Sequence, residues 1–164
     1  MRVLVTAASK HAATTDIATA IAEALSAAGI ETTVASPESV GSLEGYDAVI
    51  LGSGVYAGRW LGSAKEFVDR NSTALAAMPV WLFSSGPLGE PLKPDGEPAD
   101  AAPIANRLGA RSHHVFGGRL DRHQLSLGER AIVGLVRAPD GDYRPWDAIR
   151  AWSAGIAQDL TASR

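Results

Sequence analysis

The stretch RVLVTAASKHAATTDIA, Arg2 to Ala18, joins a strand, a polar loop and the start of a helix. The β-branched run Arg2–Thr6 is typical of a strand buried in a parallel sheet. Apolar residues then recur at helical spacing between Thr14 and Ala28, namely at Ile17, Ala20, Ile21, Ala24 and Leu25. The polar residues between the two elements therefore lie at the N-terminal end of the helix, called the helix mouth, where they can either cap the helix or bind a ligand.

This helix mouth has two interpretations that the loop alone does not separate. Thr14 or Thr15 can serve as the N-cap of a helix that Gly29 ends. Alternatively, the hydroxyls of Ser9 and Thr14 join the unpaired N–H groups of the first helical turn to form an anion site. The loop has neither a Walker pattern nor a GxGxxG pattern, so it indicates neither a nucleoside triphosphatase nor an ordinary dinucleotide-binding fold.

The rest of the chain alternates between strand and helix patterns. This alternation predicts an α/β fold with a doubly wound, five-stranded parallel sheet of order 2-1-3-4-5. We expect residues 1–164 to form one domain, with an insertion around 119–142 before the last helix. The further strands are expected at Ile30–Ala35, Asp47–Gly52, Pro79–Ser84 and His113–Gly118, and the further helices at Gly62–Ala77, Ile104–Leu108 and Trp146–Leu160.

Composition narrows the class of protein. Of the 164 residues, 46% are hydrophobic and 20% are charged, as in a globular protein. The net charge is −3, so the sequence lacks the excess of positive charge that is typical of nucleic-acid-binding proteins. With no cysteine, redox chemistry requires a bound organic cofactor. The sequence has no signal peptide and no transmembrane segment, so we expect a cytoplasmic protein.

Ligands of such sheets bind beyond the carboxyl ends of the strands, which directs attention to two further loops. In LGSGVYAGRW, Leu51–Trp60, three glycines suit a backbone that lies against a flat ligand, and Tyr56 and Trp60 offer aromatic faces. Trp60 is alternatively a buried anchor. In FSSGPLGEP, Phe83–Pro91, hydroxyl and amide groups are available as donors, although a plain Gly-Pro turn also explains it.

The first loop resembles the phosphate loop of flavodoxins. In that family the pattern Ser/Thr-x-Thr-Gly-x-Thr opens the first helix, and SKHAATTDIA matches it with Ser9, His11 and Thr14 at the hydroxyl positions. Two positions depart from the pattern: His11 replaces a hydroxyl residue, and Ala12 replaces the glycine. Lys10 and His11 also add positive charge to a site that flavodoxins build mainly from neutral donors.

Three longer stretches resemble one branch of the flavodoxin superfamily, the menaquinone-dependent protoporphyrinogen oxidase-like branch. They are GYDAVILGSGVYAGRW, PVWLFSSGPLG and GDYRPWDAIRAWSAGIA, and the similarity extends over nearly the whole chain. The resemblance implies an FMN-binding oxidoreductase that transfers electrons between flavin and a small-molecule substrate or quinone. The expected cofactor contacts are Ser9, Lys10, His11, Ala12, Ala13, Thr14, Gly54, Val55, Tyr56, Ala57, Gly58, Trp60, Ser84, Ser85, Gly86 and Pro87.

Three other functions remain open on the sequence. The chain is alternatively an electron carrier that serves a redox protein partner and has no substrate of its own. A deazaflavin is the alternative cofactor, because Lys10 and His11 suit its longer anionic tail. The missing glycine at Ala12 is compatible with a degenerate domain that binds no flavin and serves as an interaction partner.

The remaining residues give weaker signals. His113 and His114 are adjacent on a strand and face opposite sides of the sheet, so we expect no metal site. We identify no catalytic residue. Within the insertion, an apolar stripe suits an interfacial helix that meets a membrane quinone, as the resemblance implies, but equally a helix packed on its own domain or on a homodimer partner. The stripe consists of Ala131, Ile132, Leu135 and Val136.

Overall fold

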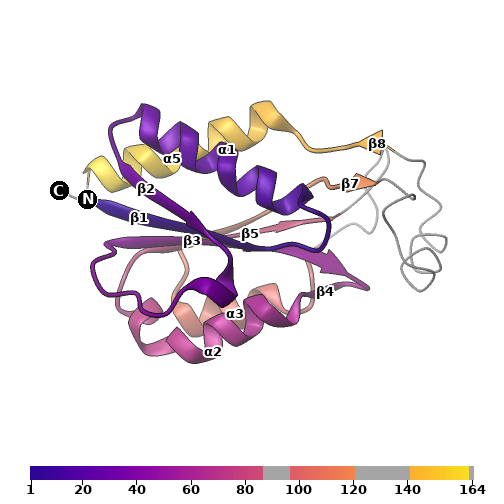
Figure 1. Ribbon diagram of the computed structural model, residues 1–164, viewed down its shortest axis with the longest axis horizontal. Helices are drawn as coiled ribbons and strands as arrows, with labels where there is room; N and C mark the ends of the chain where they lie inside the picture. Colours follow the sequence, from indigo (N-terminus) through magenta and orange to yellow (C-terminus); the bar gives the residue numbers. More distant parts are fainter. Residues whose placement is uncertain (87–96, 121–140, 163–164) are drawn as a thin grey trace.

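The computed structural model describes residues 1–86, 97–120 and 141–162. Its centre is a sheet of five parallel strands in the order β2-β1-β3-β5-β6, which confirms the predicted topology (Figure 1). The strands are β1 (Arg2–Ala8), β2 (Glu31–Ala35), β3 (Ala48–Tyr56), β5 (Val80–Ser85) and β6 (Ser112–Phe116). Their common direction brings all five carboxyl ends to one edge of the sheet.

Helices cover both faces of the sheet. In Figure 1, α1 (Ala13–Ala27) and α5 (Trp146–Ala162) lie on one side, and α2 (Gly62–Ala76) and α3 (Ala101–Leu108) on the other. Side chains alternate along each strand, so the central strands β1, β3 and β5 contribute to both cores. One core combines Val3, Val5, Ile50 and Phe83 with Ile17, Ile21 and Ile156, and the other combines Leu4, Val49, Leu51 and Leu82 with Phe67 and Ile104.

The helix that follows β1 begins differently from the expectation. Neither Thr14 nor Thr15 caps α1: the N-cap is Ala12, in the left-handed conformation with φ +64°, and no side chain caps the helix. The expectation at the other end is confirmed, because Gly29 has φ +84° and its N–H bonds the carbonyl of Ser26 at 3.0 Å. The tight turn at Ala12 makes the threonines part of the helix, where they cannot cap it.

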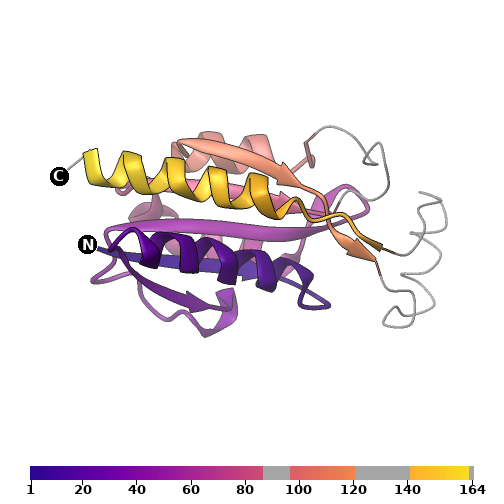
Figure 2. The same ribbon diagram turned by 90° about the horizontal axis from the view of Figure 1, so that it is seen from above.

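Several short elements surround the sheet. The two-residue β4 (Arg59–Trp60) pairs antiparallel with β3, and η1 (Pro37–Ser39) follows β2. β7 (Arg119–Leu120) and β8 (Gly141–Asp142) form a small antiparallel ribbon. Figures 1 and 2 both show this ribbon at the carboxyl edge of the sheet, the edge where α1 begins.

Two predicted features lie outside the described residues. They are the apolar stripe of the insertion and the larger part of the crossover after β5, with Pro87. Within the described part, α3 starts at Ala101 rather than Ile104, and β6 ends at Phe116 rather than Gly118. Directly after the strand, Gly117 lies against the segment that follows β8: a Cβ on Gly117 would lie 2.1 Å from the carbonyl oxygen of Tyr143. No helix of the described residues is long and apolar enough to cross a membrane.

Candidate functional site

The register of the sheet brings three loops together. Ala8 at the end of β1 pairs with Ser53 of β3, and Ser53 pairs with Ser84 of β5. The three segments that follow these strands therefore leave the same edge side by side. As the topology predicts, they are the β1–α1 loop, the β3–β4 turn and the end of β5.

The β1–α1 loop contains a strained residue. Ala12 has φ +64°, a conformation that costs an L-residue about 1–2 kcal/mol relative to the right-handed one. Its carbonyl accepts the N–H of Asp16 at 2.9 Å, which starts the helical hydrogen-bond ladder. The N–H groups of Ala13, Thr14 and Thr15 precede that ladder and point out of the helix mouth. The turn at Ala12 therefore presents backbone donors at the carboxyl edge of the sheet.

Thr14 places a hydroxyl beside these donors. The residue is 4% exposed, and within the described residues its hydroxyl makes no hydrogen bond. Its Oγ1 lies 3.2 Å from the place that a Cβ on Gly54 would occupy. The absence of a side chain at Gly54 therefore lets this hydroxyl lie close to β3. A charged ligand oxygen that accepted a hydrogen bond there would gain roughly 1.5–3 kcal/mol.

The β3–β4 turn is a two-residue hairpin with both residues at positive φ. Tyr56 pairs with Arg59, and between them Ala57 has φ +50° and Gly58 has φ +77°. Within the described residues, Ala12 and Ala57 are the two non-glycine residues with positive φ, and each lies in one of these loops. Strained conformations of this kind concentrate at ligand sites.

Contacts from other segments fix the hairpin. The ammonium group of Lys10 lies 4.3 Å from the centre of the Tyr56 ring, so the first loop touches the second. The N–H of Trp60 donates to Asp100 Oδ2 at 2.9 Å, and Arg59 Nη1 donates to Asp100 Oδ1 at 3.2 Å. The start of α3 thereby holds the hairpin in place from the side of the sheet that carries α2.

The end of β5 differs from the expectation. Trp60 Nε1 donates to Ser84 Oγ at 2.7 Å, and Ser84 Oγ lies 2.7 Å from His113 Nε2. Trp60 is 3% exposed and Ser84 fully buried, while Ser85 donates to the carbonyl of Gly117 at 3.4 Å. Both serine hydroxyls are thus engaged inside the protein, contrary to the expectation that they donate to a ligand. Trp60 is the buried anchor, not an aromatic face for a ring.

The two histidines of β6 lie on opposite faces, as alternation along a strand predicts. His113 continues the buried network to the surface, with Nδ1 3.2 Å from Glu97 Oε1. The ring of His114 lies 4.6 Å from that of Phe116 on the other face, and burial, together with the nearby His113, lowers the pKa of His114. Within the described residues, no group of acidic or histidine side chains is placed to hold a metal ion.

Two arginines complete the loop region, and sequence reasoning missed both. Arg119 Nη2 of the ribbon donates to the carbonyl of His11 at 3.2 Å. Arg144 Nη1 donates to the carbonyl of Ala13 at 3.3 Å and to Asp16 Oδ2 at 3.1 Å. The residues of these pairs are 108 to 131 positions apart in the sequence, so no local pattern indicates them.

Comparison with known proteins places this chain in a family. The Flavodoxin domain family matches residues 4–145. The chain belongs to the flavodoxin domain family. Over 98% of its length it is similar to a flavodoxin from the domain Archaea, with 17% identity, 99% of that chain covered and a TM-score of 0.65. A point mutant of flavodoxin from Pseudomonas aeruginosa matches with 16% identity, a TM-score of 0.65, and 98% of this chain and 99% of that chain covered.

A larger protein shares the fold over part of its length. Rubredoxin oxygen:oxidoreductase from Desulfovibrio gigas matches 98% of this chain but only 36% of its own, with 13% identity and a TM-score of 0.68. No curated protein matches the sequence. Against the flavodoxin pattern, Ala12 stands at the glycine position and still adopts the positive φ that glycine favours.

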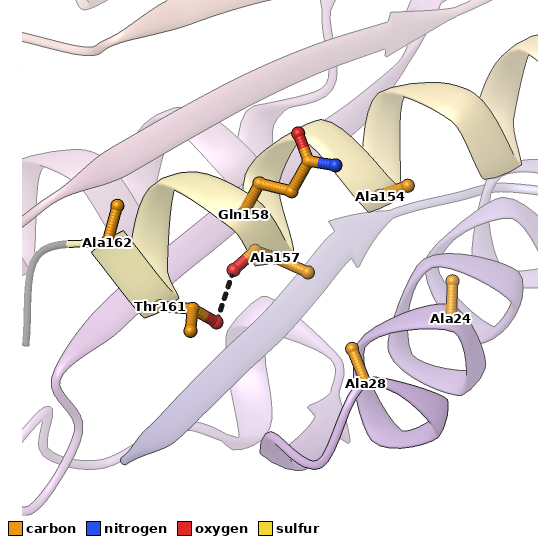
Figure 3. Close-up of a pocket in the computed structure, with 7 residues that line it drawn as sticks. All are labelled: Ala24, Ala28, Ala154, Ala157, Gln158, Thr161 and Ala162. Carbon is orange, nitrogen blue, oxygen red and sulfur yellow. Dashed lines mark hydrogen bonds between the residues drawn. The ribbon is translucent and has the colours of Figure 1, made fainter.

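The flavodoxin domain also has a shallow apolar groove far from the three loops. Figure 3 shows it between α5 and the C-terminal end of α1, where all but two of the side chains that line it are alanines. Thr161 donates to the carbonyl of Ala157 at 2.7 Å, so its hydroxyl serves the helix. The groove offers Gln158 as its one further polar side chain, which is too little chemistry to define a site.

Proposed function

We propose that the chain binds FMN non-covalently, with the phosphate at the β1–α1 loop, and that it is an oxidoreductase. Thr14 is the observation that carries this proposal. Its hydroxyl has no hydrogen bond within the described residues, although the residue is 4% exposed and lies at a helix N-terminus of a flavodoxin domain. A phosphate oxygen would satisfy both this hydroxyl and the adjacent N–H groups.

The surrounding residues fit a phosphate-bearing ring. Ser9 and Thr14 supply hydroxyls, and the loop backbone supplies N–H donors. The isoalloxazine ring is proposed to lie where the hairpin Val55–Gly58 meets the end of β5. Gly86 lies directly against Val55, since a Cβ on Gly86 would be 3.1 Å from Val55 Cβ, so the ring would lie over these two segments. Tyr56 is half-buried and is the aromatic residue of the hairpin turn. Pro87 lies outside the described residues.

The activity that we propose is electron transfer to or from a small-molecule substrate or a quinone. Bound FMN would supply the electron and hydride chemistry, while the protein binds the phosphate, orients the ring and limits access of water. Resemblance to the protoporphyrinogen oxidase-like branch supports a substrate of this kind. A plain electron carrier would instead exchange electrons only with a protein partner, and turnover with a quinone acceptor separates the two.

A deazaflavin is the second candidate cofactor. The observation in its favour is the exposed ammonium group of Lys10 above the Tyr56 ring, next to His11 in the loop. A longer anionic tail would find these groups within its reach. The conformation of Ala12 argues against a degenerate domain, because the loop keeps the left-handed turn without the glycine.

Titration of the cofactor-free protein with FMN and with a deazaflavin tests the proposal, with absorbance and flavin fluorescence as readouts. Saturable FMN binding at a ratio of one per chain is expected. Preference for the deazaflavin would replace FMN by the second candidate. Binding of neither would refute the cofactor proposal.

The substitution Thr14→Val separates ligand binding from a structural role. It removes the hydroxyl and keeps the shape, so the free protein should be as stable as the wild type or more so. FMN affinity should fall at least tenfold, since a hydrogen bond to a charged group contributes roughly 1.5–3 kcal/mol. Adding Ser9→Ala should weaken binding further. Thr19→Val, one turn along α1, is the matched control, because Thr19 donates to the carbonyl of Thr15 away from the mouth.

A further inference from the structure

Arginine contacts stand on both sides of the strained residue of the phosphate loop. Arg119 binds the carbonyl of His11 at 3.2 Å, just before Ala12, and Arg144 binds the carbonyl of Ala13 at 3.3 Å, just after it. A strained conformation persists only where its surroundings over-determine it. Both contacts come from the ribbon and the segment that follows it, which are remote in the sequence.

Arg144 is itself held on every side. Its Nε and Nη2 donate to the two carboxylate oxygens of Asp142 at 2.8 and 2.7 Å, and its Nη1 donates to Asp16 at 3.1 Å. The ring of Trp146 lies 4.7 Å from its guanidinium carbon. The side chain is 6% exposed. A guanidinium fixed by so many partners has one available geometry, so it can fix the position of the Ala13 carbonyl to which it donates.

The charge of Arg144 is already balanced where it stands. The carboxylates of Asp142 and Asp16 face it, and they raise the pKa of Arg144 while its hydrogen bonds lower the pKa of Asp142. One positive and two negative groups leave no net attraction for an anion at this point. The effect of Arg144 on a phosphate therefore has to come from geometry.

Peptide geometry supplies that effect. In a trans peptide the C=O of one residue and the N–H of the next point in opposite directions. When Arg119 holds the carbonyl of His11, the N–H of Ala12 faces away from Arg119. When Arg144 holds the carbonyl of Ala13, the N–H of Thr14 faces away from Arg144, toward the helix mouth. The two arginines thus fix the direction of two donors of the loop.

We propose that Arg144 and Arg119 are positioning residues that lock the phosphate loop in its ligand-binding conformation from outside. The proposal rests on the proposed function for the identity of the ligand, but the locking acts on the free protein as well. It assigns to the β7–β8 ribbon and the segment after it a role in cofactor affinity without contact with the cofactor.

Two ligands that differ only in the phosphate test this role. FMN and riboflavin are titrated into wild type, Arg144→Gln and Arg119→Gln, and the ratio of their dissociation constants measures the contribution of the phosphate. The ratio should fall about tenfold in Arg144→Gln and by a smaller factor in Arg119→Gln, which loses one contact, while riboflavin affinity stays constant. Arg150→Gln, which removes an exposed arginine of α5, should change neither.

Amide hydrogen exchange tests the same lock without any ligand. The N–H of Asp16 bonds the carbonyl of Ala12, so its exchange reports opening of the strained turn. Exchange should be at least tenfold faster in Arg144→Gln and Arg119→Gln than in wild type and Arg150→Gln. Thermal unfolding shows which variants fold. If Arg144→Gln does not fold, the affinity ratio and the amide exchange are both measured on Arg119→Gln.

The outcomes separate the two proposals. An unchanged ratio of FMN to riboflavin affinity, or unchanged exchange at Asp16, would overturn the positioning role even if FMN binds well. Absence of flavin binding by the wild type would refute the proposed function, and exchange at Asp16 would then decide alone whether the arginines lock the loop. Equal weakening of FMN and riboflavin would also overturn the positioning role, because the lock acts on the phosphate.

Discussion

Thr6 and Thr14 each carry a hydroxyl that makes no hydrogen bond within the described residues. Because the two threonines lie in different places, one hydroxyl bears on ligand binding and the other on the stability of the fold. Thr14 lies at the helix mouth, beside Gly54 of β3. The hydroxyl of Thr6 is sealed inside β1, between Ala35 and Leu51 of the neighbouring strands. The hydroxyl of Thr14 can reach a ligand, whereas that of Thr6 lowers the stability of the fold.

Thr6→Val should therefore stabilise the protein. Valine has the same shape without the unsatisfied group, so we expect a gain of about 1 kcal/mol in unfolding free energy and a rise of roughly 2–4 °C in Tm. Urea and thermal unfolding measure both. Thr32→Val is the control, because Thr32 Oγ1 lies 2.9 Å from Ser26 Oγ and its loss should destabilise. Destabilisation by Thr6→Val would reveal a partner for its hydroxyl, such as a buried water.

At the scale of elements, the β3–β4 hairpin is built around a turn whose residues both have positive φ. Such two-residue turns match the twist of the flanking strands and favour Asn-Gly over Ala-Gly. Ala57→Asn should thus stabilise the protein by about 0.5–1 kcal/mol, because asparagine tolerates this conformation better than alanine. Unfolding in urea is the measurement.

The second turn position provides the opposite expectation. A Cβ on Gly58 would meet no atom within 4 Å, so Gly58→Ala adds strain without a clash. It should destabilise by about 1 kcal/mol, as an alanine at positive φ requires. Stabilisation by Gly58→Ala, or destabilisation by Ala57→Asn, would contradict this account of the hairpin.

The elements that the sequence predicts well are those with a clear apolar pattern. The strands β1, β3 and β5 are continuous runs that are buried on both faces, and the helices α1, α2 and α5 bury a side chain every three to four residues. The strands β4, β7 and β8 have two residues each and leave no such period. The threonine cap of α1 was a wrong prediction because the left-handed turn at Ala12 replaces it.

That the three loops bind a cofactor stays a prediction. Their meeting at one edge of the sheet was predictable, because parallel strands bring their carboxyl ends together, and the structure confirms it. The contacts beneath the loops were not predictable. The sequence suggests Ser84 as a hydrogen-bond donor to a ligand, but in the fold Trp60 Nε1 donates to the Ser84 hydroxyl, and His113 Nε2 lies within hydrogen-bond distance of it. Arg119 and Arg144 reach the first loop only through tertiary docking of the ribbon, which a local pattern cannot reveal.

At the scale of the whole molecule, later segments of the chain hold the loops that earlier strands present. Asp100 fixes the β3–β4 hairpin, and Arg144 fixes the β1–α1 loop. Both anchors use charges, so protonation affects the folded state. The pKa of Asp142 is lowered by its hydrogen bonds to Arg144, that of Glu38 by hydrogen bonds to its own backbone and to Ser63, and that of His114 by burial.

All three pKa values are lowered, so all three groups should make the unfolding free energy change with pH in the same direction. A pKa below the ordinary value means that the unfolded chain binds more protons on acidification, so stability is complete above the unfolded pKa and is lost as the pH falls. We expect a first decline in unfolding free energy below about pH 6.5, from His114, and a second below about pH 4.5, from Glu38 and Asp142. Urea unfolding at a series of pH values from neutral to acidic measures both.

Single substitutions assign the two steps. His114→Gln should flatten the first decline and leave the second, because it removes the imidazole that packs against Phe116. Asp142→Asn should lower stability at neutral pH and weaken the second decline, since the ion pair with Arg144 is already lost. A first decline that stays as steep in His114→Gln would assign it to another group. If Asp142→Asn differs from wild type equally at neutral pH and below the second decline, the ion pair is not what links the ribbon to acid stability.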